Sequence, residues 1–190
     1  MVYIPGKLLF IHIPKTGGKS VIRVLTKQGG ILSIINGKFL PPYSTVIEAQ
    51  NSLAGEFNRL FSFCFVRNPW DWFVSKYEYV IQSKAHNLKD YFIELGFKRY
   101  IQTHEGGPSQ QMKFFCKNGE PQVTYVGRFE SLGTELLHVL NLNGLDANIK
   151  IPHIGATKRR PYKEYYDEET KQIIEKVERD IINRFGYKFE

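Results

Sequence analysis

Short apolar runs alternate with amphipathic stretches along this chain. Two of the runs, Lys7–Ile13 (KLLFIHI) and Phe61–Val66 (FSFCFV), have the length of buried strands and end in turn-forming residues. A stretch with apolar residues at helical spacing follows each run, Ser20–Gln28 after the first and Pro69–Ser83 after the second. The pattern therefore predicts two buried strands that each lead into a helix.

The alternation continues through the rest of the chain. The last helix is the clearest, because an acidic first turn opens it, apolar residues recur on one face and Gly186 follows it. Strands that alternate with helices indicate an α/β fold, in which a parallel sheet carries helices on both faces. Ligands bind such sheets at the carboxyl ends of the strands, where the turns after Ile13 and Val66 lie. The further elements that we expect are a strand over Val123–Gly127 and helices over Leu88–Gln102, Leu132–Leu142 and Asp167–Phe185.

Length and composition predict one domain over residues 1–190, because the chain has no repeat, low-complexity tract or obvious linker. The net charge is +7, which suits polyanionic partners such as nucleotides, glycans, nucleic acids or acidic membranes. No recognisable nucleic-acid-binding motif is present, so we expect no nucleic-acid partner. The aromatic content of 14% is high, and aromatic side chains line ligand clefts as well as cores.

The two cysteines, Cys64 and Cys116, imply no disulfide framework and lack zinc-ligand spacing. The segment Met1–Phe10 is too short for a signal peptide, and no apolar run approaches the length that spans a bilayer. We therefore expect a cytoplasmic protein without stable membrane insertion.

The turn after the first strand, Pro14–Ser20 (PKTGGKS), has the parts of an anion-binding loop. Its two glycines, Gly17 and Gly18, let the backbone approach an anion, and the N–H groups at the start of the next helix point at it. Lys15 and Lys19 supply charge, and Thr16 and Ser20 supply hydroxyl groups. A nucleoside triphosphatase loop would need Gly at position 13, which is Ile13, so that alternative is weak.

The turn after the second strand places Arg67 at the strand end and Ser75 two turns into the next helix. A nucleoside triphosphatase usually has a magnesium-binding Asp at such a strand end. Arg is instead suited to bidentate binding of a phosphate group. Asn68 is a good N-cap residue and Pro69 is favoured at the first helical position, so the helix start is well defined.

Together the two loops resemble those of the sulfotransferases that use 3′-phosphoadenosine 5′-phosphosulfate (PAPS), and specifically the carbohydrate, family-2-like branch. In that family the first loop reads close to P-K-T-G-[GST]-[TS]-S and the second close to R-[ND]-P-x-x-R-x-x-S-x-Y. They stand here as Pro14–Ser20 and Arg67–Tyr77. Val126–Glu130 and Thr157–Tyr162 look like later segments of the family. The resemblance implies a three-layer α/β fold like that of P-loop NTPases.

The resemblance also implies roles for individual residues. Lys15 would act on the bridging oxygen and the sulfuryl group, and the rest of its loop would grip the 5′-phosphosulfate. Arg67 and Ser75 would hold the 3′-phosphate, and at least one of Lys158, Arg159 and Arg160 would close over the nucleotide. This chemistry requires no metal, and the chain shows no metal-ligand constellation.

Three positions depart from the family pattern. Lys19 stands where Thr or Ser is usual, and its charge either touches a phosphate or points to solvent. Trp72 stands where Arg is frequent. Tyr43 occupies a segment where related enzymes often carry a His, so an acceptor-activating His is not carried over to that position.

A general base should remove the proton of the acceptor hydroxyl. The favoured candidates are His104, in a loop rich in Gly and Pro, and Glu48, on an expected helix after Tyr43. His12 and Glu105 are weaker candidates, and His12 fits a packed, loop-supporting role better because it lies inside the first strand.

The sequence thus predicts a PAPS-dependent sulfotransferase acting on a hydroxyl group, with a glycan favoured among the acceptors. A P-loop kinase and a non-enzymatic protein that binds polyanions or nucleotides are the alternatives. Magnesium- and ATP-dependent turnover would indicate the kinase, and salt-sensitive binding without transfer would indicate the binding protein.

Overall fold

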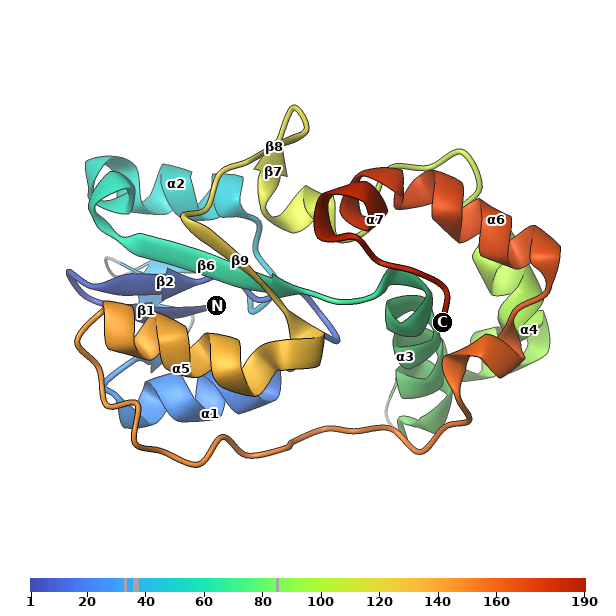
Figure 1. The fold of residues 1–190 in the computed structure, drawn as a ribbon, viewed down its shortest axis with the longest axis horizontal. Coiled ribbons are helices and arrows are strands. Elements are labelled where there is room, and N and C mark those ends of the chain that lie inside the picture. The colour runs from blue at the N-terminus through green and yellow to red at the C-terminus, as the bar shows by residue number, and fades with distance from the viewer. Residues whose placement is uncertain (33, 36–37, 85) are drawn as a thin grey trace. The chain divides into compact units, whose positions relative to one another are not determined.

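The structure is a computed structural model that describes residues 1–32, 34–35, 38–84 and 86–190. The chain forms two compact units (Figure 1). The sheet unit consists of Met1–Val66 and Met112–Gly155, and the helical unit consists of Arg67–Gln111 and Ala156–Glu190. A single domain over residues 1–190 stays a prediction.

The sheet unit is built on a five-stranded sheet in the order β3-β1-β2-β6-β9. Its centre is parallel, because β6 pairs in parallel with both β2 and β9. The expectation of a wholly parallel sheet is wrong at the edge, where β1 pairs antiparallel with β2 and β3. Only three residues connect β1 to β2, and so short a connection permits only a hairpin. The strands are β1 (Val2–Ile4), β2 (Leu8–Phe10), β3 (Ile31–Leu32), β6 (Phe61–Val66) and β9 (Tyr125–Arg128).

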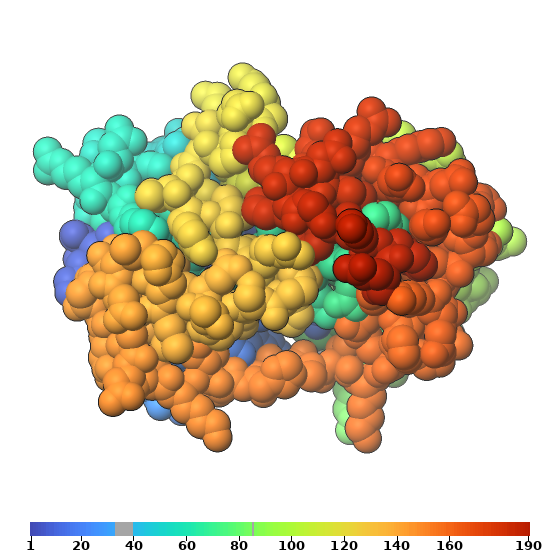
Figure 2. Space-filling view, in the orientation of Figure 1, coloured from blue at the N-terminus to red at the C-terminus, as the bar shows by residue number. Residues whose placement is uncertain are grey.

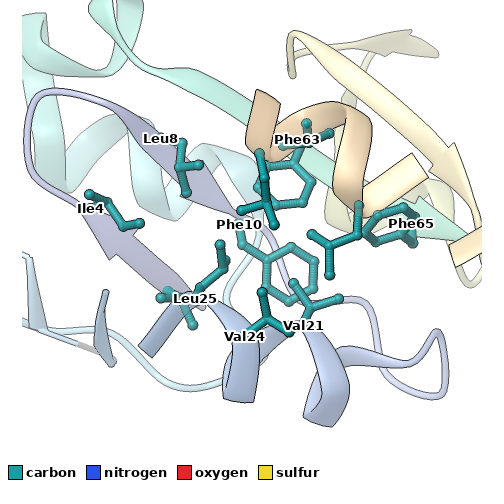
Figure 3. Close-up of a cluster of buried hydrophobic side chains, with 12 residues drawn as sticks. Ile4, Leu8, Phe10, Val21, Val24, Leu25, Phe63 and Phe65 are labelled. Atoms are coloured by element: carbon teal, nitrogen blue, oxygen red, sulfur yellow. The ribbon is translucent and has the colours of Figure 1, made fainter. Parts of the chain in front are cut away.

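Helices flank this sheet: α1 (Gly18–Lys27) and α5 (Leu132–Leu142) lie on one face and α2 (Val46–Leu53) on the other (Figure 1). Phe10 of β2 and Phe63 of β6 are register partners and are fully buried. Figure 3 shows Phe10 next to Val21 and Val24 of α1, in the buried cluster that also contains Phe63. Fully burying a side chain of this size stabilises the fold by about 2 kcal/mol, so this cluster fixes the first helix against the sheet.

Helix α5 and the residues after it lie on the surface of the sheet unit (Figure 2). The remaining elements of this unit are short. Two-residue strands and single turns carry no readable periodicity, so sequence analysis did not find them. They are the hairpins β4 (Ile34–Ile35) with β5 (Lys38–Phe39) and β7 (Cys116–Lys117) with β8 (Glu120–Pro121), and the 3₁₀ turns Ala54–Arg59, Met112–Phe114 and Phe129–Ser131.

The helical unit confirms the predicted start of its first helix: the Asn68 side chain accepts a hydrogen bond from the N–H of Asp71, and Pro69 occupies the first turn. The predicted helix Leu88–Gln102 is interrupted at Gly96, whose φ is +71°. The helices of the unit are α3 (Pro69–Gln82), α4 (Lys89–Gln102), α6 (Glu168–Val177) and α7 (Arg179–Phe185), with a 3₁₀ turn over Tyr162–Tyr165.

The single helix predicted over Asp167–Phe185 is wrong, because the chain breaks between α6 and α7 at Glu178. This residue is fully buried, and its carboxylate accepts hydrogen bonds from Ser109 Oγ and from the N–H of Gln110, both at 2.6 Å. A buried carboxylate needs such partners, and reaching them overrides the local helical preference.

Candidate functional site

The loop Pro14–Ser20, predicted to bind an anion, follows β2 and includes the start of α1. Lys15 has a φ of +64° and Gly17 a φ of +78°, so two left-handed residues flank Thr16. A left-handed backbone costs a residue with a side chain roughly 1–2 kcal/mol, and such strain gathers at functional sites. Gly17 stands at the N-cap and has no side chain with which to cap the first turn of α1. Backbone N–H groups and the positive end of a helix dipole at such a helix start suit an anion.

Both glycines of the loop are also required by packing. A Cβ atom on Gly17 would lie 2.6 Å from Cδ2 of Leu132 and 3.2 Å from the ring of Phe129. A Cβ atom on Gly18 would lie 1.9 Å from Nε2 of His12. The start of α1 is thus held between the histidine of the preceding strand end and the beginning of α5.

The polar side chains of the loop differ in placement. The Thr16 hydroxyl is fully buried and donates to the carbonyl oxygen of Ile13 at 2.8 Å, so it braces the loop internally. Ser20 is buried, and its Oγ accepts a hydrogen bond from the N–H of Ile154 at 3.2 Å. Lys15 is half-buried. Lys19 is exposed, and its side chain lies alongside Gly155. A Cβ atom on Gly155 would lie 3.2 Å from Lys19 Cδ.

His12 is packed beneath the loop, as its position inside the first apolar run indicated. Its side chain is 6% exposed and lies between the rings of Phe10 and Tyr43, with centroids at 5.7 and 4.8 Å. Within the described part of the chain, Nδ1 has no hydrogen-bond partner. Burial lowers the pKa of His12 to about 3, so the imidazole is neutral at physiological pH.

Glu48, a predicted candidate for the general base, lies in the first turn of α2. Its carboxylate accepts hydrogen bonds from the N–H and the hydroxyl of Thr45, at 2.6 and 2.9 Å, and the Thr45 hydroxyl accepts in turn from the Glu48 N–H. This capping box accounts for a glutamate at position 48 without any catalytic function. A catalytic role for Glu48 stays a prediction.

In the helical unit, Arg67 is buried and meets the carboxylate of Asp71 one turn into α3. Its Nε donates to Asp71 Oδ2 at 2.7 Å, and one terminal nitrogen lies 2.5 Å from the same oxygen. The other oxygen, Oδ1, lies 2.6 Å from a terminal nitrogen of Arg159. Two of the predicted phosphate-binding residues, 92 positions apart in the chain, are therefore joined through one carboxylate.

The backbone of Arg67 is held separately by Gln111, which is fully buried. The Gln111 side chain accepts from the N–H of Arg67 and donates to its carbonyl oxygen, both at 2.9 Å. The Gln111 amide thus forms hydrogen bonds with both backbone polar groups of Arg67, the first residue after β6.

Ser75, the other predicted 3′-phosphate ligand, is buried on α3 in a polar stripe of that helix. Asp71, Ser75, Glu78 and Gln82 recur at spacings of four, three and four residues, which places them on one face. Glu78 accepts from the hydroxyl of Tyr165 at 2.6 Å, and Gln82 Nε2 donates to the carbonyl oxygen of Lys158 at 2.6 Å. The basic segment, Lys158–Arg160, is thereby anchored along the stripe.

The members of the basic segment are not equivalent. Arg159 is half-buried on Asp71, whereas the side chains of Lys158 and Arg160 are exposed. Arg160 lies over the ring of Tyr165 at 4.8 Å and 3.7 Å from the Glu164 carboxylate. Arg159 is therefore the member that the structure orders next to Arg67.

His104, the other favoured base, lies just after α4 and is half-buried. Its Nδ1 is 2.9 Å from the carbonyl oxygen of Tyr100, and its ring contacts the rings of Phe73 and Tyr100 at 4.9 Å. An Nδ1–H donated to that carbonyl leaves Nε2 as the basic nitrogen. Glu105 is exposed beside it. A role for either residue in proton transfer stays a prediction.

The predicted site residues thus fall into two sets. The sheet unit holds the loop Pro14–Ser20 with Glu48, and the helical unit holds Arg67, Ser75, Lys158, Arg159 and His104. Sequence analysis missed Asp71, although its position four residues after Arg67 on a helix is a recognisable ion-pair spacing. It also missed Gln111, for which no local signal exists.

The structure has a parallel-centred sheet, a glycine-rich loop at a helix start and a buried arginine at the end of the neighbouring strand. A family model described as "Sulfotransferase family" matches residues 5–188, and the chain belongs to the sulfotransferase family. The resemblance drawn from the two loops is thereby confirmed. A search of curated proteins and a search of solved structures each found no match. No helix within the described residues is long and apolar enough to cross a membrane.

Proposed function

We propose that the protein transfers the sulfuryl group of PAPS to a hydroxyl group of a carbohydrate. The observation that supports this best is the loop Pro14–Ser20, which combines a left-handed Lys15 with an N-cap glycine at the start of α1. The 5′-phosphosulfate of PAPS carries the charge that such a loop binds. The three-layer, P-loop-like arrangement belongs to the same proposal.

The residues of the helical unit fit the second phosphate of this donor. Arg67 is 7% exposed and Ser75 is 3% exposed, and Arg159 meets Arg67 through Asp71. A guanidinium group held in a partly buried position gives a strong, directional contact to phosphate. Arg67, Ser75 and Arg159 would therefore bind the 3′-phosphate, which distinguishes PAPS from most other adenine nucleotides.

In the reaction, an oxygen–sulfur bond forms to the acceptor hydroxyl as the bond from sulfur to the bridging phosphate oxygen breaks. The acceptor proton would pass to a base, for which we favour His104 because the carboxylate of Glu48 is engaged in its capping box. Lys15 would stabilise the charge that develops on the bridging oxygen. The leaving group is 3′-phosphoadenosine 5′-phosphate (PAP).

The acceptor class rests on charge and aromatic content. A net charge of +7 suits an anionic glycan, and exposed rings such as Tyr43 and Tyr79 suit stacking on sugars. A screen of hydroxylated acceptors with labelled PAPS tests this part, and transfer to phenols or peptides alone would replace the carbohydrate.

The donor is tested by thermal unfolding of the chain with PAP. A ligand present at 100 times its Kd stabilises the folded state by about 2.7 kcal/mol, so the Tm should rise clearly. Lys15→Met should lower sulfuryl transfer by at least roughly 100-fold and leave the fold intact. Lys117→Met, which removes an exposed lysine of the same unit, is the control and should retain full transfer.

The outcomes separate the alternatives. No stabilisation by PAP together with Mg²⁺- and ATP-dependent turnover would replace the proposal with a kinase. Salt-sensitive binding of polyanions without transfer from PAPS would replace it with a binding protein.

A further inference from the structure

The carboxylate of Asp71 lies between two guanidinium groups of the helical unit. Oδ2 accepts from Arg67 Nε at 2.7 Å, and Oδ1 lies 2.6 Å from a terminal nitrogen of Arg159. The side chains of Arg67, Asp71 and Arg159 are 9, 18 and 17% exposed, so solvent screens these contacts only partly. Each carboxylate oxygen therefore serves a different arginine.

The three side chains carry two positive charges and one negative charge. Their sum of +1 favours an anion, while the single carboxylate keeps the two guanidinium groups together against their mutual repulsion. Without the carboxylate, two like charges in a partly buried place would separate, and each long side chain would regain its rotamer freedom.

The polar stripe of α3 restricts where the side chain of Arg159 can lie. Asp71 and Ser75 are one turn apart on the same face, and the basic segment is tied to that face again at Glu78 and Gln82. The anchoring of Lys158 and Tyr165 on either side of Arg159 limits where its side chain can reach. Asp71 then selects the position in which Arg159 lies next to Arg67.

We infer that Asp71 is a positioning residue that holds Arg67 and Arg159 as a preformed site for the 3′-phosphate, and so determines the preference for a 3′-phosphorylated nucleotide. The inference rests on the proposed function.

The experiment measures the Kd of PAP and of adenosine 5′-phosphate, which lacks the 3′-phosphate, by calorimetric titration. The Kd of adenosine 5′-phosphate divided by the Kd of PAP is the preference for the 3′-phosphate. Asp71→Asn should lower this ratio by about tenfold, the usual scale for losing a group that orients a direct ligand. A purely structural role would weaken both nucleotides equally and leave the ratio unchanged.

Asp167→Asn is the matched control. Asp167 is also an aspartate of the helical unit paired with a cation, Lys98 at 2.7 Å, but that cation is no predicted ligand. This variant should lose stability and keep the ratio. Arg159→Gln should lower the ratio in the natural chain and change it little in the Asp71→Asn background, because the two residues act together.

Each result has one meaning. An unchanged or larger ratio in Asp71→Asn overturns the inference, and a larger one would show that the carboxylate competes with the phosphate. Should that variant fail to fold, Arg159→Gln alone decides, and an unchanged ratio there overturns the inference. Equal Kd values for both nucleotides in the natural chain would overturn the proposed function as well.

Discussion

The imidazole of His12 occupies the space that a side chain at residue 18 would need: a Cβ atom on Gly18 would lie 1.9 Å from Nε2. Real Cβ atoms do not come so close to another heavy atom, so the ring and a glycine require each other. The ring itself is fixed from the other directions by Phe10 and Tyr43. The packing of Gly18 at the start of α1 therefore depends on His12, which lies two residues after β2.

Gly18→Ala should displace the start of α1 or the His12 ring. We expect the free energy of unfolding to fall by roughly 1–3 kcal/mol, the usual cost of overpacking a dense site, together with loss of PAP binding. Gly133→Ala is the control, because a Cβ atom there meets nothing within 4 Å and Gly133 lies in α5. Urea denaturation and titration with PAP check both variants, and unaltered binding by Gly18→Ala would contradict the argument.

His12 should make the stability depend on pH. Burial lowers its pKa to about 3 in the folded chain, whereas the ordinary value is 6.5. Unfolding therefore takes up a proton between these two values, so the free energy of unfolding falls as the pH falls from about 6.5 towards 3, by at most about 1.4 kcal/mol per pH unit. Above about pH 7 this contribution is constant.

His12→Gln removes this titration. The natural chain should lose about 2 kcal/mol more than the variant between pH 6.5 and 4.5, measured by denaturant unfolding at each pH. His153→Gln, which removes an exposed imidazole, should retain the pH dependence of the natural chain. Parallel stability profiles for the natural chain and His12→Gln would show that His12 is not the group responsible.

Lys15 combines a side chain of predicted function with an unfavourable backbone conformation, since its φ is +64°. Glycine tolerates this conformation and alanine does not. Lys15→Gly should therefore be more stable than Lys15→Ala by about 1 kcal/mol, although both should lower transfer roughly 100-fold or more. Chemical denaturation and a labelled-PAPS assay make the comparison. If alanine proved the more stable substitution, the backbone of residue 15 would not be strained as described.

Much of the fold could be predicted because its signals are local. The strand Phe61–Val66 and the helix Leu132–Leu142 have their predicted bounds. The turn at Asn68-Pro69 was also predicted, since capping and the fixed φ of proline act over a few residues. Both loops were found for the same reason: each is a short contiguous motif.

What sequence analysis missed depends on contacts between distant residues. The break at Glu178 follows from hydrogen bonds to Ser109 and Gln110, which lie in another segment of the chain. The pairing of Arg159 with Asp71 likewise joins a C-terminal loop to α3. The pattern of apolar residues continues through Glu178, so no reading of periodicity could have placed that break.

Gln111 leads to a final prediction, because its amide satisfies both backbone groups of Arg67 inside the helical unit. Gln111→Leu keeps the approximate volume and removes two buried hydrogen bonds to the Arg67 backbone, which should cost roughly 2–4 kcal/mol of unfolding free energy. Gln110→Leu, at the neighbouring half-buried position, should cost at most about 0.5 kcal/mol. Urea denaturation compares the two. Because Arg67 would shift with its backbone, Gln111→Leu should also weaken PAP more than adenosine 5′-phosphate. Equal weakening of both nucleotides would mean that the amide supports the fold without positioning Arg67.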